Sequence, residues 1–332
     1  MKALVSQASG GPETLELIEL PDPQPGLGEV RIAVAACGIN YPDVLVIEDR
    51  YQSRPIRPFA PGAEVSGVID AIGPGVTGLA VGDRVASGTP FGGLAQKALA
   101  PAENCYRLPD SVPFDVGAGM LVTYGTSHHA LKDQARLQAG ETLLVLGAAG
   151  GVGLAAVELG KAWGARVIGA VSSEAKAEIV RVHGADEVIV YPPDGLNDRA
   201  AAKAFTDKIK ALSNGGVNVV YDSVGGSYAE PALRAVAWAG RYLVVGFPAG
   251  IPSIPLNLTL LKGSSIVGVF WGAFTAQFPE LNRRNIAELF GMMAAGSISP
   301  LVSARFPLEQ GGEAIAMLAD RLAIGKVVVT VD

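Results

Sequence analysis

The sequence predicts an α/β protein that combines a doubly wound parallel sheet with a second domain of β-barrel type. Three observations carry this prediction. Strand and helix signals alternate from about residue 121, a glycine turn joins the first of these strands to a helix, and the first 120 residues are rich in Gly, Pro and short β-type runs. Alternating strands and helices favour a parallel sheet between helical layers. Short strands divided by turn signals favour a barrel.

The barrel-type region contains apolar or alternating runs such as VRIAVAACGI and VSGVIDAIG, divided by turn signals such as PGLGE and GPGVTG. In the region of alternating elements, six strands and four helices are expected. The strands are expected near 143–146, 166–171, 187–190, 217–221, 241–245 and 265–269, and the helices near 151–163, 175–183, 199–213 and 229–238.

Past residue 275 the chain leaves the alternating pattern: a helical stretch, a short extended piece, a final helix and the strand GKVVVTV follow. We expect this tail to return and complete the barrel-type domain. The predicted domains are therefore 1–122 together with 266–332, and 123–265.

The glycine turn is the most informative motif in the chain. Gly147, Gly150 and Gly153 follow the apolar run TLLVL and precede an Ala- and Leu-rich helical stretch, and a second apolar run follows at 166–171. A dinucleotide site needs this order, because the strand must end in a turn tight enough for backbone N–H groups and a helix N-terminus to meet a pyrophosphate. A Cβ in the turn blocks the phosphates or the helix–strand contact. The motif predicts a nucleotide site.

The end of the second strand indicates which coenzyme binds. Ser172, Ser173 and Lys176 stand where a site that prefers NAD usually carries a carboxylate for the ribose 2′-hydroxyl. Hydroxyls and a cation suit a 2′-phosphate, which favours NADPH. Glu174 is an alternative carboxylate if it turns inward. The serines can also simply cap the next helix while Lys176 lies in solvent.

Composition excludes several classes of protein. The chain has 332 residues, of which 49 % are hydrophobic and 17 % charged, and a formal net charge of −6. It has no basic tract, so neither nucleic acid nor an anionic membrane is expected as a partner. It has no run of about 18 apolar residues and no signal-peptide pattern. We expect a soluble, cytoplasmic protein.

The inventory of metal ligands is small. Cys37 and Cys105 cannot form a disulfide framework or a four-thiolate zinc site. His128 and His129 are adjacent in a predicted helix, so their side chains point about 100° apart and cannot chelate one ion together. We expect ordinary structural imidazoles and no metal.

Seven separate stretches support a resemblance to a known family. They are ACGINYPDVL at 36–45, PGAEVSGVI at 61–69, GDRV at 82–85, LGAAGGVG at 146–153, GADEVIVY at 184–191, VYDSVGG at 220–226 and GKVVV at 325–329. In these the chain resembles the zinc-free medium-chain dehydrogenases/reductases, in particular the NADPH:quinone oxidoreductase (zeta-crystallin-like) branch. The resemblance implies a Rossmann domain and a GroES-like catalytic domain. One departure is Glu158, where the branch usually has glutamine.

Differences from the zinc alcohol dehydrogenases are also informative. Their cysteine ligand and following histidine correspond to the stretch after Cys37, which reads Gly38-Ile39-Asn40, and their G-H-E motif reads Gly62-Ala63-Glu64. Their four-cysteine structural lobe is represented only by Cys105. Without a Lewis acid, reduction of an electron-poor acceptor is the expected chemistry.

The resemblance also implies roles for individual residues. Asn40, Tyr51 and Thr126 are the candidate catalytic residues, and Tyr41 and Trp271 are candidates for the acceptor pocket. The candidate coenzyme-binding residues are Ala149, Gly150, Gly151, Val152, Ser172, Lys176, Tyr191, Gly225, Gly246, Phe247 and Phe270. The alternatives are an ordinary rim tyrosine for Tyr191, simple turn formation for the glycines, and a turn that satisfies local backbone for Asn40. Phe270 and Trp271 are alternatively core or dimer-interface aromatics. Asp43 is expected to cap a helix.

The leading hypothesis is hydride transfer from NADPH to a quinone or a similar conjugated acceptor, with protein hydrogen bonds to the developing oxyanion. Reduction of α,β-unsaturated carbonyls or enoyl thioesters is the main alternative, with Tyr51 or a held water as acid. A non-enzymatic NADPH- or RNA-binding role is a third. We also expect a homodimer, because an edge strand near 265–269 needs covering.

Overall fold

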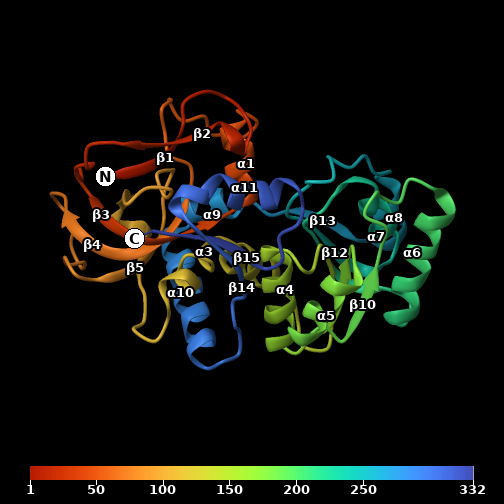
Figure 1. Ribbon diagram of the computed structural model, residues 1–332. Coiled ribbons are helices and arrows are strands. Elements are labelled where there is room, and N and C mark those ends of the chain that lie inside the picture. Colours follow the sequence, from red (N-terminus) through yellow and green to blue (C-terminus); the bar gives the residue numbers. More distant parts are fainter. Residues whose placement is uncertain (332) are drawn as a thin grey trace. The chain divides into compact units, whose positions relative to one another are not determined.

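The computed structural model describes residues 1–331 and divides into two compact units. The first unit comprises Met1–Val122 and the chain from Pro300 onward, and the second comprises Thr123–Ser299. Each unit is described by itself. Figure 1 labels the elements along the chain.

The first unit is built on one mixed sheet. Its strands follow the order β14-β15-β3-β4-β5-β7, and β6 also pairs with β3. Only the β14–β15 pair is parallel. The bounds are β3 Glu29–Ile39, β4 Glu64–Ile72, β5 Arg84–Gly88, β6 Lys97–Pro101, β7 Cys105–Arg107, β14 Val302–Pro307 and β15 Lys326–Thr330. The unit also contains β1 Lys2–Ser6, β2 Leu15–Glu19, α1 Tyr41–Ile47, α2 Phe114–Gly117 and α11 Gly311–Ala319, and α3 Leu121–His128 begins there.

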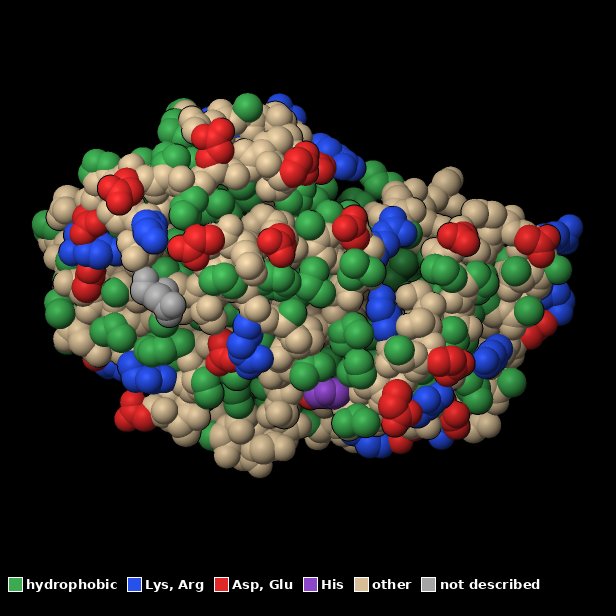
Figure 2. Space-filling view, in the orientation of Figure 1, with side chains coloured by type: hydrophobic (Ala, Val, Ile, Leu, Met, Phe, Trp, Pro, Cys, Tyr) green, Lys and Arg blue, Asp and Glu red, His purple; other side chains and the backbone are tan. Residues whose placement is uncertain are grey.

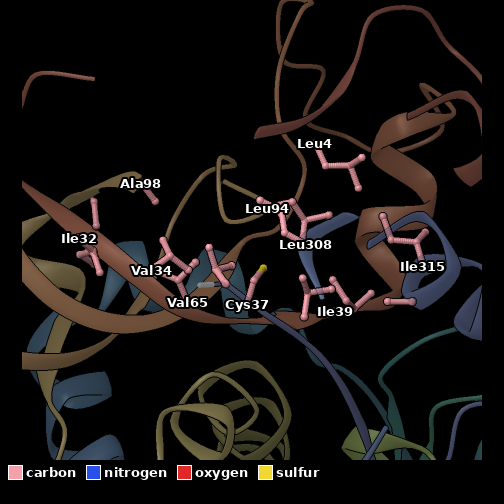
Figure 3. Packing of buried hydrophobic residues seen from close by; sticks show 14 of the residues in the cluster. Leu4, Ile32, Val34, Cys37, Ile39, Val65, Leu94, Ala98, Leu308 and Ile315 are labelled. Carbon is pink, nitrogen blue, oxygen red and sulfur yellow. The ribbon is translucent and has the colours of Figure 1, made fainter. Parts of the chain in front are cut away.

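Alternation of side chains along β3 creates the core of this unit. Val30, Ile32 and Val34 are buried and separated by half-buried residues, as expected for a strand with one face on the core. Figure 3 shows Cys37 in the same cluster, beside side chains of β4 and of the chain near Leu94. The cysteine is thus part of a hydrophobic core.

The second unit is a parallel sheet in the order β10-β9-β8-β11-β12-β13. Its strands are β8 Thr142–Leu146, β9 Arg166–Val171, β10 Glu187–Val190, β11 Val217–Asp222, β12 Val236–Val244 and β13 Ser265–Gly268. Its helices include α4 Gly151–Ala162, α5 Glu174–Val182, α6 Arg199–Leu212, α7 Ala229–Arg234, α8 Asn257–Lys262, α9 Trp271–Gln277 and α10 Pro279–Ala294, and most of α3 lies here. The chain order reverses direction in the sheet between β8 and β11. The doubly wound fold predicted from the sequence is confirmed.

Two sequence expectations differ from the structure. The helix expected at 229–238 is shorter, because α7 ends at Arg234 and β12 begins at Val236. Residues 266–299, assigned from the sequence to the barrel-type domain, belong to the second unit. The physical reason is that β13 adds a further strand to the parallel sheet, and α9 and α10 continue from it. Across residues 1–331, every helix is too short or too polar to span a membrane.

Candidate active site

The carboxyl edge of the parallel sheet gathers the predicted coenzyme residues. Hydrogen bonds just beyond the strand ends join neighbouring strands: Ala148 N donates to Ala170 O, and Tyr191 N donates to Val171 O. On the other side of β8, Ser223 Oγ donates to Leu146 O at 2.9 Å. Ligands of open parallel sheets bind at this edge, next to the point where the strand order reverses. The glycine turn after β8 lies at that point.

The glycine turn is closed against its own backbone. Gly147 has a φ of +70°, and a Cβ at Gly153 would lie 2.1 Å from Gly147 O. Gly150, the N-cap of α4, has no side chain to accept from the first-turn N–H groups. The turn therefore fits a pyrophosphate, with Ala149, Gly151 and Val152 beside the helix N-terminus.

The end of β9 carries the residues expected at a 2′-phosphate. Ser173 caps α5 and accepts from Lys176 N at 3.3 Å, so its capping role is observed. Lys176 Nζ lies 3.4 Å from Ser172 Oγ, and burial lowers the pKa of this lysine. Glu174 is exposed in the first turn of α5. The lysine, and not the glutamate, turns toward the serine at the strand tip.

Tyr191 follows β10 directly, but its ring is mostly buried. It is 7 % exposed and packs 4.6 Å from the Tyr228 ring and 6.2 Å from the Phe205 ring, measured between centroids. The residue is at the expected edge of the sheet. Its aromatic face is largely used for packing, so contact with a coenzyme is limited to its rim.

Beyond β11 and β12, an aspartate builds a second glycine turn. Asp222 Oδ1 accepts from Val224 N and Gly225 N, both at 2.8 Å, and burial raises the pKa of Asp222. Gly225 has a φ of +71°, and a Cβ there would lie 2.6 Å from Phe247 Cβ. Gly246 and Phe247 therefore run close to this turn, and Phe247 is about half exposed.

The aromatic pair after β13 lies beside α3. Phe270 is exposed, whereas Trp271 is half-buried and donates from Nε1 to Asn282 Oδ1 at 3.1 Å. A Cβ at Gly125 would lie 2.7 Å from the Trp271 ring, so the indole packs closely against Gly125 of α3. The next residue, Thr126, is half-buried. Thr126 and Trp271 are thus neighbours within the second unit.

The remaining acceptor candidates belong to the first unit and surround α1. Asn40 is the N-cap of this helix, Tyr41 is its first residue, and Tyr51 follows its end. Asp43 caps the helix as expected, because its Oδ2 accepts from Asn40 N at 2.8 Å. Burial raises the pKa of Asp43 to about 6, opposed by hydrogen bonds from Asn40 N and Gly62 N. Burial, and then the nearby Asp43, raise the pKa of Tyr51, so its phenol keeps its proton.

A lysine that sequence reasoning left without a role completes this polar cluster. Lys326 Nζ donates to Asn40 Oδ1 at 2.6 Å and to Glu64 Oε2 at 2.7 Å. Asn40 Nδ2 donates to Glu64 Oε2 at 3.0 Å and to Gly38 O at 3.2 Å. The side chains of Lys326 and Glu64 are 5 % and 0 % exposed. Both amide hydrogens of Asn40 are therefore engaged within the protein.

These residues do not fit a zinc ion. Cys37 is buried, and burial raises the pKa of its thiol, which opposes the thiolate that zinc needs. Asn40 offers an amide and Ala63 only a methyl group, and the Lys326 ammonium donates to both Asn40 and Glu64. Within residues 1–331, no cluster of three His, Cys, Asp or Glu side chains is arranged to hold a metal. His128 and His129 have different neighbours, Trp163 and Phe274 respectively.

Sequence reasoning missed three polar residues besides Lys326. Glu64 appeared only as the remainder of a lost zinc motif, Asp222 as part of the YDSVGG stretch, and Glu158 as a departure from the usual glutamine. Glu158 is buried and accepts from Tyr124 OH at 2.7 Å and from Ser299 N at 2.9 Å. The available signal was a charged residue inside an otherwise apolar strand or helix, since such a residue needs an internal partner.

Two family models match the chain. The one described as "Alcohol dehydrogenase GroES-like domain" covers residues 26–110, within the first unit, and "Zinc-binding dehydrogenase" covers residues 151–287, within the second. Together with the mixed sheet and the parallel sheet, they place the chain in the class of medium-chain dehydrogenases/reductases, which are oxidoreductases.

Curated relatives narrow the class. The chain is 39 % identical over 309 residues to a quinone oxidoreductase-like protein 2 homolog of Nematostella vectensis, covering 92 % of this chain and 82 % of the relative. It is 34 % identical over 317 residues to human quinone oxidoreductase, covering 95 % and 92 %. The chain belongs to the quinone oxidoreductase family.

Solved structures agree with this assignment. A mycobacterial protein solved in complex with NADPH superposes with a TM-score of 0.92 at 33 % identity, covering 99 % of this chain and 100 % of its own. Escherichia coli quinone oxidoreductase, also solved in complex with NADPH, gives a TM-score of 0.89 at 26 % identity, with the same coverage.

Proposed function

We propose that the protein binds NADPH at the carboxyl edge of its parallel sheet and reduces a quinone or a similar conjugated carbonyl compound. One observation carries the proposal. The glycine turn after β8, the Ser172–Lys176 pair after β9 and the Gly225 turn after β11 all lie along the same edge of the parallel sheet. Two similar structures were solved with NADPH, which supports the choice of coenzyme.

Each part of this edge has a defined task. The α4 N-terminus, with the N–H groups of Ala149, Gly151 and Val152, binds the pyrophosphate. Gly150 holds the turn itself, because its N–H donates to Gly147 O at 3.0 Å. Lys176 and Ser172 bind the 2′-phosphate by charge-assisted hydrogen bonds, with Tyr191 at the rim. The backbone can approach the nicotinamide ribose closely at Gly225, Gly246 and Phe247. Phe270 covers the nicotinamide ring. When bound, NADPH supplies the hydride.

On the acceptor side, the chain orients a flat substrate and stabilises its reduced form. Tyr51 offers a phenol that keeps its proton, which can donate to an oxygen gaining negative charge. Tyr41 offers an aromatic face for stacking in the first unit, and Trp271 offers one in the second. Thr126 offers a second hydroxyl. The amide of Asn40 donates to Glu64 and Gly38, so Asn40 acts by holding the beginning of α1 in place.

We further propose that the reaction needs no zinc. The support is the donor set: an amide, a methyl group and an ammonium occupy the region where a zinc enzyme needs anionic or imidazole ligands. Metal analysis of protein purified without added zinc should find far less than one equivalent. Stoichiometric zinc at this site contradicts the proposal.

A panel of acceptors tests the reaction. NADPH oxidation should be measured with benzoquinones, alkenals and enoyl thioesters under the same conditions. Turnover with quinones supports the proposal. Negligible turnover with every quinone, beside good turnover with alkenals or enoyl thioesters, contradicts it and favours reduction of an activated double bond with Tyr51 as acid.

We also propose that the protein is a homodimer joined at the β13 edge. β13 ends the parallel sheet and pairs with β12 alone. Large apolar side chains near it are exposed: Trp238, Ile251, Leu256, Leu260 and Leu261. An uncovered strand edge beside apolar side chains favours association. Light scattering should give twice the chain mass, and a monomer at micromolar concentration contradicts this.

The expected partner is a small molecule. On the face drawn in Figure 2, basic side chains are scattered among acidic ones and form no continuous stripe, which does not suit nucleic acid. Cys37 and Cys105 are free and buried. Free thiols suit a reducing compartment, and we place the protein in the cytoplasm.

A further inference from the structure

We propose that Lys326 is a positioning residue for the acceptor side of the reaction. Its buried ammonium holds the beginning of α1, and with it Tyr41 and Tyr51, in the geometry that substrate reduction needs. This inference deepens the proposed function and rests on it.

The first unit reserves space for this side chain. A Cβ at Gly38 would lie 1.9 Å from Ala118 O and 2.8 Å from Lys326 Cε, and a Cβ at Gly119 would lie 3.0 Å from Lys326 Cγ. Lys326 opens β15, directly opposite the end of β3 in the antiparallel pair. The lysine stem therefore runs between two glycines, and its head reaches the turn between β3 and α1.

The ammonium connects segments that are far apart in the sequence. Asn40 links it to the N-terminus of α1, and Glu64 links it to the start of β4. The second oxygen of Glu64, Oε1, accepts from Val122 N at 3.0 Å, at the start of α3. One cation thus fixes the helix that carries Tyr41 against two strands and a second helix.

A purely structural role makes a different prediction from a positioning role. A buried ion pair can often be replaced by neutral residues without loss of stability, whereas removing one partner leaves an uncompensated charge. If Lys326 only stabilises the fold, a neutral pair restores both stability and turnover. If it positions α1, a neutral pair restores stability alone.

The experiment compares Lys326→Met with the double variant Lys326→Met/Glu64→Gln. The control is Lys2→Met, which removes an exposed lysine of the same unit that is paired with Glu309. Urea midpoints, NADPH binding by calorimetry, and kcat and KM for the acceptor should be measured for each variant. NADPH binding reports on the second unit, which carries no substitution.

We expect the single variant to be strongly destabilised and the double variant to unfold near the wild-type midpoint. In the double variant NADPH affinity should stay within about twofold, while kcat falls about tenfold or more, because small misplacements of catalytic groups are costly. A folded double variant with kcat within about twofold of wild type overturns the inference, because a neutral pair should not restore turnover if Lys326 has a positioning role.

Hydrogen exchange provides a readout that does not depend on activity. Amides of Tyr41–Ile47 should exchange about tenfold faster in the double variant, because α1 loses its anchor, while amides of α4, which contributes no residue to the Lys326 cluster, are unchanged. Unchanged exchange in α1 overturns the inference. If the wild-type protein reduces no acceptor, the proposed function fails and hydrogen exchange alone decides whether Lys326 anchors α1.

Discussion

Both units place a lysine near polar side chains, but they use it differently. In the first unit, Lys326 is buried and donates to Asn40 and Glu64 at 2.6 and 2.7 Å. In the second, Lys176 is only partly buried, and its contact with Ser172 is 3.4 Å long. A buried ammonium with short hydrogen bonds to a carboxylate holds the surrounding elements in place. We propose that Lys176, half-buried beside a hydroxyl, binds an anion that arrives from solution.

The same contrast holds for the backbone. The polar cluster of the first unit is closed by side chains from β3, β4, α1 and β15. Crowded glycines occur in both units, since a Cβ would lie 1.9 Å from Ala118 O at Gly38 and 2.1 Å from Gly147 O at Gly153. The turn that Gly153 closes, however, leads into the N-terminus of α4 at the carboxyl edge of the parallel sheet. We infer that the first unit is organised to hold its own groups still, and the second to bring backbone N–H groups to a ligand.

The largest expected effect is on the free energy of unfolding when the buried Lys326–Glu64 ion pair is broken. Lys326→Met leaves Glu64 charged and buried without its cation, so the free energy of unfolding should fall by about 3–5 kcal/mol. The exposed control Lys2→Met should change it by about 0.5 kcal/mol or less. Urea denaturation of both variants measures the difference. Equal changes in unfolding free energy for the two variants mean that the buried pair does not hold the first unit together.

The next effect concerns the pH dependence of the same cluster. The folded-state pKa of Asp43, about 6, exceeds the 3.8 of an ordinary aspartate. The folded state therefore prefers the protonated carboxyl, and this contribution is fully present below pH about 4 and lost as the pH rises through 6. The difference corresponds to about 3 kcal/mol at most.

Comparison with Asp43→Asn isolates this effect. The variant loses one acceptor, so it is less stable, but it has no carboxyl to titrate. Unfolding free energies at pH 4 to 7 should show the wild type losing its advantage over the variant as the pH rises. A constant difference across this window means that the pKa of Asp43 is not raised.

A third prediction tests the glycine turn of the second unit. Gly153→Ala places a Cβ against Gly147 O, which is backbone and cannot move aside alone. The strain should cost up to about 3 kcal/mol, and NADPH affinity should fall because the turn opens. Gly291→Ala in α10 is the matched control, because a Cβ there meets open space. Calorimetry on both variants measures binding; equal affinities contradict the proposed pyrophosphate turn.

The smallest effect is on coenzyme selectivity. Lys176→Glu should weaken the binding of NADPH by roughly tenfold more than the binding of NADH, because a charge-assisted hydrogen bond contributes about 1.5 kcal/mol or more. Lys203→Glu, an exposed lysine of α6 paired with Asp207, is the control. Titrations with both coenzymes provide the comparison. Equal weakening of NADPH and NADH places Lys176 away from the phosphate.

Much of the second unit could be predicted because its signals are local. The glycine turn and its flanking strand and helix lie within about 30 residues. All six expected strands are present, five of them within about one residue of their expected bounds, whereas β12 begins at Val236 and not at the expected residue 241. The expected helix is longer than α7, because apolar residues 236–238 continue the helical pattern although they begin β12, in which Val236 pairs with Val217 of β11. Short apolar runs do not distinguish the two.

The first unit shows what sequence patterns cannot supply. Lys326 and Asn40 are 286 residues apart, and only the pairing of β15 with β3 brings them together. The candidates Asn40, Tyr41 and Tyr51 were found through family resemblance, whereas the groups that hold them were not. Assignment of residues 266–299 failed for a similar reason, since an added sheet strand is fixed by tertiary pairing.

We propose that the protein uses NADPH to reduce a conjugated carbonyl compound and needs no metal to do so. The most direct measurement is the rate of NADPH oxidation with a benzoquinone before and after treatment of the protein with a strong chelator, with metal content determined in both samples. The account predicts an unchanged rate in protein that holds essentially no zinc. A rate that is lost with the metal and regained on adding zinc contradicts it.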